Sequence, residues 1–267
     1  MITLSQLAIY PIKSCAQIAL HKADISPFGL AMDRRWMLVD ENGTMLTQRK
    51  HPRLCLIQPE LNNRALRIQA PDMPVLQVPE INTRDNTLLE TTASVWNDSC
   101  RAIDCGEAAA RWFSDFLGIS ARLVFFPDNE ERQVDLNYAR KGDKTAFSDG
   151  FPYLLISQES LDDLNNRLDT PVEMKRFRPN LVVRGATAFA EDQWQKIRMG
   201  EVSFRLVKPC SRCIIPSINP ATAEKTTEPL KTLSGYRMRD NKIFFGQNVI
   251  AEGSGRLETG MQVEVLE

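Results

Sequence analysis

Short runs of apolar residues, bounded by turn residues, recur along the first 90 positions of the chain. Runs of four to eight residues with this composition are typical of β-strands rather than helices. The strands that this pattern predicts span residues 4–9, 19–25 and 36–39. We therefore expect the amino-terminal part to be rich in β-structure.

Turn residues between these runs predict two hairpins. Asn42-Gly43 separates the run 36–39 from residues 45–48, and an Asn-Gly pair between strands is a strong hairpin signal. A second hairpin is predicted to pair residues 54–61 with 65–69 across the turn 62–64. The segment is expected to form a small barrel or sandwich.

Two stretches have helical rather than strand periodicity. Within 107–117, Ala109, Trp112, Phe113 and Phe116 recur at helical spacing, and Gly118 can cap the end. Further on, Ser157 can cap a second helix that carries three leucines on one face and ends at Thr170-Pro171. Those leucines are Leu161, Leu164 and Leu168.

Strands predominate again in the second half. A polar stretch at 127–146 reads as a long loop, a domain seam or a mobile lid. The strands predicted around it span residues 122–126, 153–156, 180–184, 202–207, 244–251 and 262–266. Few helices among many short strands indicate a β-dominated α+β fold.

Composition bounds the class of protein. The chain has 267 residues, of which 43% are hydrophobic and 25% charged, and this suits two medium domains. A net charge of −1 gives no global reason to expect nucleic acid or an anionic membrane as partner. Its apolar runs are too short for a spanning helix, and no secretory signal is visible. The expected compartment is the cytoplasm.

Cysteine and histidine usage narrows the chemistry. Six cysteines are too sparse for a disulfide scaffold and agree with a reducing compartment. Only His21 and His51 could serve as a histidine base, so a serine–histidine hydrolase is disfavoured. The cysteines are Cys15, Cys55, Cys100, Cys105, Cys210 and Cys213.

The segment 208–216, Lys-Pro-Cys-Ser-Arg-Cys-Ile-Ile-Pro, is the most informative stretch. Pro209 is expected to stop the preceding strand and to place both sulfurs on a turn, where an arginine beside a thiolate lowers its pKa. A zinc site would need two more ligands, and a thioredoxin-like pair should open a helix, which Pro216 disfavours. The third interpretation is one working thiolate beside one structural cysteine.

Basic motifs elsewhere indicate an anion site. Residues 10–15, 33–36 and 175–180 each place lysine or arginine at the edge of a predicted strand. Arginine forks bind phosphate in a bidentate manner, although a solvated charged edge is the better explanation of any one motif alone. Together with Cys213, these motifs predict a thiolate beside a phosphate pocket.

Six motifs in a fixed order resemble one known family. They are Tyr-Pro-Ile-Lys-Ser at 10–14, Asp-Arg-Arg-Trp at 33–36, Phe-Ser-Asp-Gly-Phe-Pro at 147–152, Phe-Arg-Pro-Asn-Leu at 177–181, Lys-Pro-Cys-Ser-Arg-Cys at 208–213 and Phe-Gly-Gln-Asn at 245–248. The chain is similar over essentially its whole length to MOSC-domain proteins with an amino-terminal β-barrel, such as bacterial YcbX proteins and the mitochondrial amidoxime-reducing component. The resemblance implies a MOSC β-barrel domain at 121–267 behind a barrel domain at 1–120 whose strands contribute to the cofactor cleft.

The resemblance also implies a molybdenum–molybdopterin cofactor. A pterin dithiolene would hold the metal, and Cys213 would complete its sulfur ligands as the catalytic residue, while Cys210 has no assigned ligand role. Asp149 and Gly150 are expected to line the same cleft. The residues expected around the pterin and its phosphate are Lys13, Ser14, Arg34, Arg178, Asn180, Ser211 and Arg212. Soft sulfur for the metal and donors for an anionic pterin agree with these residue types.

The reaction that the resemblance implies is reductive removal of oxygen from N-hydroxylated compounds, such as hydroxylamines, N-hydroxylated bases and amidoximes, in a detoxifying role. Cys100 and Cys105 have the first spacing of a [2Fe–2S] motif, but Ala108 stands where the third ligand belongs, so no iron–sulfur cluster is expected in this chain.

Many bacterial relatives carry a ferredoxin domain after the MOSC domain, whereas this sequence stops at Glu267. We therefore expect either a fragment that lacks this domain or a separate electron donor of ferredoxin, cytochrome or flavin-reductase type. The alternative is a cofactor-binding or sulfur-carrier module without turnover.

Overall fold

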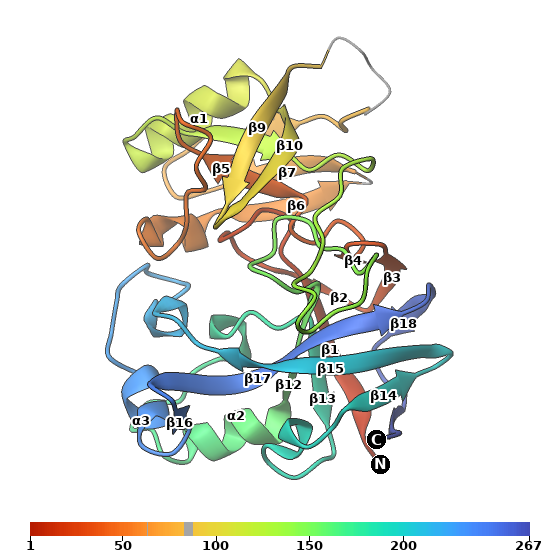
Figure 1. Ribbon diagram of the computed structural model, residues 1–267. Coiled ribbons are helices and arrows are strands. Elements are labelled where there is room, and N and C mark those ends of the chain that lie inside the picture. Colours follow the sequence, from red (N-terminus) through yellow and green to blue (C-terminus); the bar gives the residue numbers. More distant parts are fainter. Residues whose placement is uncertain (63, 83–87) are drawn as a thin grey trace.

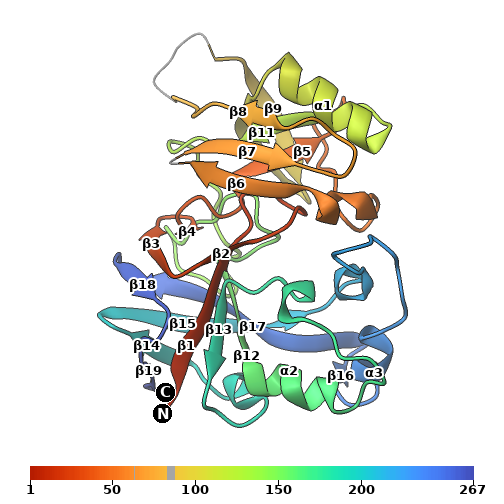
Figure 2. The same cartoon turned by 180° about the vertical axis from the view of Figure 1, so that it is seen from behind.

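The computed structural model describes residues 1–62, 64–82 and 88–267 and shows two lobes, one above the other (Figure 1). Both chain ends lie at the base of the lower lobe. From behind, β1 (Thr3–Ile9) runs through the lower lobe toward the seam between the lobes (Figure 2). Within the described ranges, none of the helices is long and apolar enough to cross a membrane.

The lower lobe is built on one large, mixed sheet. Among the described residues this sheet has nine strands, and β1 pairs antiparallel with β13, with Leu7 opposite Leu181. Its path runs β19 (Val263–Val265), β14 (Lys196–Met199), β15 (Val202–Ser211), β17 (Lys242–Glu252), β12 (Tyr153–Ser157), β13 (Leu181–Arg184), β1 and β2 (Ile18–Leu20), with β16 (Met238–Arg239) beside β17. A core cluster that includes Leu4, Leu155 and Phe204 stabilises it by burying apolar surface.

Two smaller sheets and a helix make the upper lobe. One sheet has the order β5 (Trp36–Val39), β11 (Arg122–Phe125), β10 (Asp98–Asp104) and β9 (Glu90–Val95), and the other β6 (Gln58–Asn62), β7 (Ala65–Gln69) and β8 (Leu76–Val78). The helix α1 (Glu107–Leu117) packs Trp112, Phe113 and Phe116 onto Trp36 and its neighbours. A third small sheet, β18 (Arg256–Glu258), β3 (Lys22–Ser26) and β4 (Gly29–Leu30), lies near the seam in Figure 1.

The strands cross the predicted division at residue 120 in both directions. β1 and β2, from the start of the chain, belong to the sheet of the lower lobe, whereas β11 lies between β5 and β10 in the upper lobe. Strand pairing between segments far apart in sequence produces this exchange. The chain therefore passes the seam several times, and residues from both halves meet there.

Both predicted helices form. α1 spans the predicted residues, and its C-cap Gly118 has φ of 70°, a conformation that glycine adopts without steric cost. At the start of α2 (Gln158–Asn165), the Ser157 hydroxyl accepts from the amide of Ser160 at 3.1 Å. The α2 helix ends before Leu168, which therefore packs from the following segment. A third helix, α3 (Leu230–Ser234), was not predicted.

Several strand predictions need correction. The predicted strand 19–25 is two strands, β2 and β3, interrupted at His21. Residues 45–48 form only an isolated bridge, Met45 opposite Val39, and the predicted strand 54–61 begins as a 3-10 turn, Pro52–Leu56, because Pro52 sets a turn conformation. The second hairpin is confirmed as β6 and β7, with Asn63 of its turn outside the described residues.

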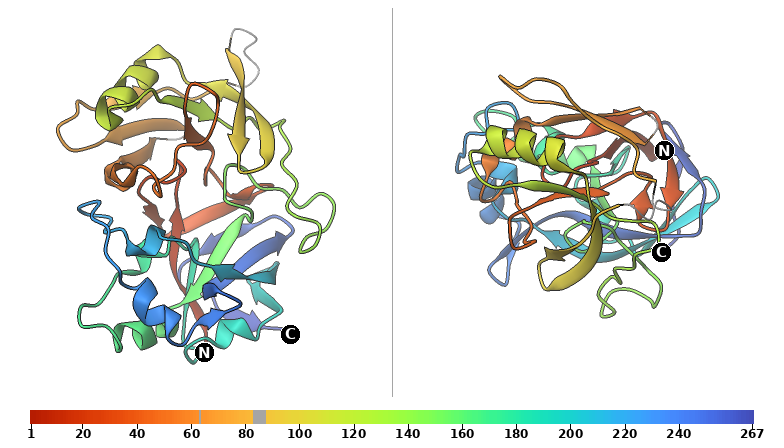
Figure 3. Two further views of the ribbon diagram at one scale, coloured as in Figure 1. Left: turned by 60° about the vertical axis from the view of Figure 1, so that its left-hand side comes forward. Right: turned by 90° about the horizontal axis from the view of Figure 1, so that it is seen from above.

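The long loop between β11 and β12 is anchored rather than free. It runs along the side of the molecule at the seam (Figure 3). Arg132 is buried in it and donates to the carbonyls of Ala146 and Ser148 at 2.9 and 2.6 Å, and to Asp98 at 2.7 Å. These bonds anchor the end of the loop just before Asp149, and the predicted long loop is confirmed.

Candidate functional site

All ten residues that the sequence singles out line one pocket of about 840 Å³, formed by both halves of the chain. The carboxyl end of β1 and the amino ends of β12 and β13 meet at one edge of the large sheet, because β1 is antiparallel to β13 and β12 is parallel to it. The ten residues are Lys13, Ser14, Arg34, Asp149, Gly150, Arg178, Asn180, Ser211, Arg212 and Cys213.

A chain of charges crosses the pocket wall. The buried ammonium of Lys13 donates to Asp149 Oδ1 at 2.6 Å and to the carbonyl of Phe147 at 2.7 Å. Arg49 donates to the other Asp149 oxygen at 2.7 Å. Burial lowers the pKa of Lys13 to about 8, against the opposing charge of Asp149. Although burial opposes it, Lys13 and Arg49 hold the pKa of Asp149 well below its usual range.

Two guanidiniums of the pocket lie close to one aromatic ring. Arg34 and Arg178 lie 4.3 and 4.2 Å from the ring centroid of Tyr10. Arg34 also donates to Asp33 at 2.5 Å and to the Asn180 amide oxygen at 2.9 Å, and Asn180 donates to the carbonyl of Ala8 on β1 at 3.1 Å. This network fixes the guanidiniums before any ligand arrives.

Three of these residues have left-handed backbone conformations. The φ angles of Ser14, Arg34 and Arg178 are 71°, 46° and 60°. Such conformations cost roughly 1–3 kcal/mol for a residue other than glycine, and they persist where the surrounding structure requires them. Their coincidence in one pocket indicates that the backbone is shaped for a ligand.

The segment carrying the thiols differs from the prediction. β15 does not stop at Pro209 but continues through Cys210 and Ser211, and only Cys213 lies beyond it. β14 pairs with β15 only between Val202 and Arg205, so Pro209 lies on an open edge of the sheet, and register shifts against β17 flank it. A proline, which lacks the amide donor, is tolerated at such edges and bulges.

The sulfur of Cys210 contacts a guanidinium. Arg212 Nη1 lies 3.1 Å from Cys210 Sγ, and its Nη2 donates to the carbonyl of Phe177 at 2.6 Å. Arg49 and Cys213 line the same pocket, and although burial opposes it, the charges of Asp149 and Cys213 raise the pKa of Arg49. The buried Nε of Arg212 has no hydrogen-bond partner among the described residues.

Arg49 is the functional residue that the sequence analysis missed. It reaches the pocket from the upper lobe and its guanidinium also lies 4.7 Å from the centroid of Trp96. The basic run Arg49-Lys50-His51 before Pro52 was a usable signal. It follows directly after the predicted hairpin strand 45–48, and nothing distinguished it from a solvated surface.

The other four cysteines lie away from this pocket. Burial raises the pKa of Cys15, Cys55, Cys100 and Cys105, and that of Cys100 reaches about 11. Cys100 lies on β10 and Cys105 follows it, within the cores of the upper lobe. In the described part of the chain, no three His, Cys, Asp or Glu side chains gather as a metal site. Zinc bound by protein side chains alone therefore finds no support there.

Two family descriptions match the chain. Residues 1–120 match the MOSC N-terminal beta barrel domain, and residues 142–264 match the MOSC domain. The mitochondrial amidoxime-reducing component 1 is 36% identical in Mus musculus and 35% in Homo sapiens, over 99% of this chain in both and over 82% and 83% of those proteins.

A third relative carries the same region within a longer protein. The molybdenum cofactor sulfurase of Danio rerio is 34% identical over 91% of this chain, which corresponds to 31% of the sulfurase. The paired domains and the extent of the first two matches are decisive for classification. The chain belongs to the family of MOSC proteins with an N-terminal β-barrel domain that includes the mitochondrial amidoxime-reducing components.

Proposed function

We propose that this chain is a molybdenum-cofactor-dependent reductase of N-hydroxylated compounds. The observation that carries the proposal is the half-buried Cys213 thiol, which lines one pocket together with Lys13, Arg34 and Arg178. A soft sulfur ligand beside fixed cations suits a thiophilic metal held by an anionic cofactor. The names of the amidoxime-reducing relatives support the same class of reaction.

The residues present fit a molybdopterin. In this assignment, Cys213 holds the metal, and the donors of the pocket hold the pterin and its phosphate, while Asp149 and Gly150 line the cleft. The unpartnered Nε of Arg212 and the cations that line the pocket leave donors for an anionic group. When bound, this cofactor supplies the two-electron reduction that takes oxygen from nitrogen. The proposed pterin and phosphate donors are Lys13, Ser14, Arg34, Arg178, Asn180, Ser211 and Arg212.

The protein's own contribution is electrostatic and positional. Lys13 and Arg49 are held against Asp149 before a ligand binds, so their charges need no reorganisation. Arg49 lines the pocket with Cys213, so its positive charge favours the thiolate form of that sulfur. Because the pocket wall comes from both halves of the chain, the cofactor would tie the lobes together.

Metal analysis and a reduction assay test this proposal. Chain produced in a host that makes molybdopterin is expected to contain molybdenum near one atom per chain and to reduce a hydroxylamine with a chemical electron donor. Cys213→Ser should lose the metal and the activity, whereas Cys210→Ser, the matched neighbour, should keep most of both. Equal loss in the two variants would argue against a single sulfur ligand.

A carrier or sulfur-handling module is the second candidate. The similarity to a molybdenum cofactor sulfurase favours it, because this region occurs there within a longer protein. The alternative would be established if the protein binds molybdopterin stoichiometrically but reduces no N-hydroxylated compound with any of several electron donors. Ferredoxin, cytochrome and flavin-reductase donors are the ones to compare.

A further inference from the structure

A second pocket of about 520 Å³ lies at the seam between the lobes, and the proposed cofactor does not account for it. Six of its lining residues come from the first 58 positions and six from the segment 175–220. It shares only Arg178 and Ile215 with the pocket that holds Cys213. Arg178 therefore forms part of the wall between the two spaces.

The lining of this pocket is cationic. Lys175, Arg176 and Arg178 contribute, and none of the 12 lining residues is acidic. Lys175 is paired with Glu173 at 2.8 Å, but Arg176 and Arg178 make no ion pair within the described residues. Burial lowers the pKa of both guanidiniums more than Glu173 raises that of Arg176 or Asp33 raises that of Arg178, which shows the cost of holding these charges away from water. An anion in the pocket would offset this cost.

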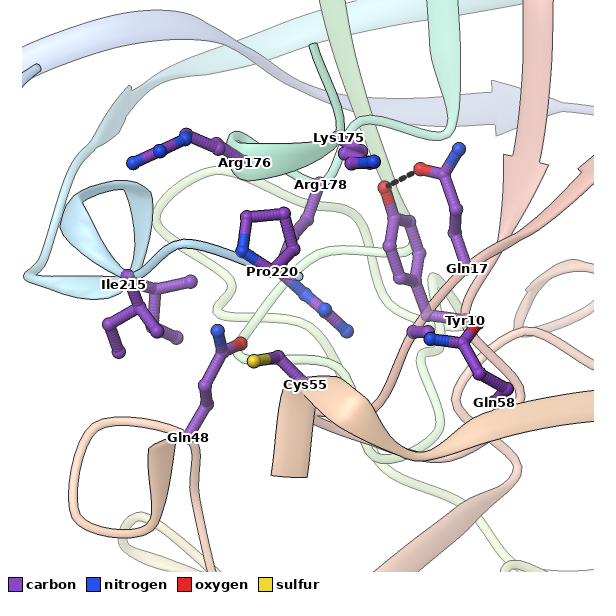
Figure 4. Close-up of a pocket in the computed structure, with 12 residues that line it drawn as sticks. Tyr10, Gln17, Gln48, Cys55, Gln58, Lys175, Arg176, Arg178, Ile215 and Pro220 are labelled. Carbon is purple, nitrogen blue, oxygen red and sulfur yellow. Dashed lines mark hydrogen bonds between the residues drawn. The ribbon is translucent and has the colours of Figure 1, made fainter. Parts of the chain in front are cut away.

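One buried polar atom faces the same space. Gln48 lines the pocket and is only 3% exposed, yet its amide oxygen has no hydrogen-bond partner. Figure 4 shows the Gln48 amide beside the sulfur of Cys55, near Arg178 and Pro220. Buried acceptors are almost always satisfied, so this oxygen indicates a missing donor. An anion alone cannot supply one.

We propose that this pocket binds a phosphate group that carries a proton, with its ionised oxygens facing Arg176 and Arg178 and its P–OH donating to the Gln48 amide oxygen. Hydrogen phosphate offers acceptors and a donor at once, whereas sulfate, of the same size and shape, offers acceptors only near neutral pH. The side chains of Ile215, Ile218 and Pro220 give an apolar wall for the body of a phosphate ester.

Calorimetric titration of the full chain with inorganic phosphate, sulfate and glycerol 3-phosphate tests the proposal at a pH of about 6, where a phosphate ester still carries its proton in a large fraction of molecules. Phosphate should bind at least about tenfold more tightly than sulfate, because sulfate leaves the Gln48 oxygen unpaired. Tighter binding of glycerol 3-phosphate than of inorganic phosphate would identify an organic ester as the ligand, and the reverse would identify the free ion. Equal affinity for phosphate and sulfate overturns the proposal.

Variants locate the binding. Gln48→Leu should retain the fold, as checked by thermal unfolding, and reduce the preference for phosphate to within about twofold. Arg176→Gln should weaken phosphate about tenfold or more, whereas Arg184→Gln, an exposed arginine on β13, should change nothing. Lys13→Gln separates the two pockets. If Lys13→Gln abolishes phosphate binding and Arg176→Gln leaves it intact, the phosphate binds beside Cys213. That result would refute the assignment of phosphate to the second pocket.

Discussion

Arg49 Nη2 lies 2.7 Å from Asp149 Oδ2, and the other oxygen of that carboxylate accepts from Lys13 at 2.6 Å. Three charges from separate parts of the chain thus form one unit at the pocket that contains Cys213. The Asp149 side chain is 54% exposed, whereas those of Lys13 and Arg49 are 6% and 20% exposed. The carboxylate therefore anchors two less exposed cations, and variants of Arg49 and Asp149 test what this arrangement does.

Removing the Arg49 charge should impair the site without unfolding the chain. We expect the Arg49→Gln variant to retain about tenfold less cofactor than the unchanged chain, because the charge-assisted hydrogen bond to Asp149 and the positive charge in the Cys213 pocket are lost. Arg49→Lys should fall between this variant and the unchanged chain. Arg53→Gln, an exposed arginine of the same lobe, serves as control. Full cofactor retention in Arg49→Gln would contradict the role.

Asp149 gives a stability signature in acid. Its folded pKa lies below the unfolded value of about 3.9, so its ion pairs stabilise the fold at higher pH and are lost only as the pH falls through the lower, folded value. In urea unfolding, Asp149→Asn should cost about 1 kcal/mol, a modest value because the carboxylate is half exposed. The difference from the unchanged chain should stay constant from pH 7 to about pH 5 and diminish only below that.

Gly246 should tolerate no side chain. Its φ is 81°, and an added Cβ would lie 2.6 Å from Ile156 Cγ1 and 2.8 Å from the carbonyl of Leu155. Gly253 also has a positive φ, 109°, but open space around it. In urea unfolding, Gly253→Ala should cost about 1 kcal/mol from backbone strain, and Gly246→Ala at least about 2 kcal/mol more from overpacking. Similar costs would show that the sheet relaxes around β17.

Thiol labelling distinguishes the six cysteines. In cofactor-free chain at pH 8, a disulfide reagent should react rapidly with Cys210 and Cys213, which line the open pocket. The other four should react slowly, because burial raises their pKa and restricts access. Cys213→Ser should remove one rapid equivalent. Rapid labelling that the variant does not reduce would show that the sulfur is less accessible than the structure indicates.

Much of the fold follows from local sequence. The helix α1 was predicted to the residue because its apolar spacing and Gly118 are signals contained within twelve positions. The prediction of a strand at residues 45–48 was wrong, because an extended segment becomes a strand only where a neighbouring strand pairs with it. Of these four residues, only Met45 forms a bridge, opposite Val39. The end of β15 was misjudged because the open edge at Pro209 depends on where β14 stops.

The sequence by itself determined the residue types of the site and, through six ordered motifs, the family. The tertiary structure alone decided that the ten chosen residues share a pocket, that Arg49 joins them across 100 positions, and that β1 and β11 exchange lobes. Motifs and caps depend on near neighbours, whose interactions a sequence displays. Contacts between distant segments depend on how sheets pair and pack, and that free energy is distributed over the whole molecule.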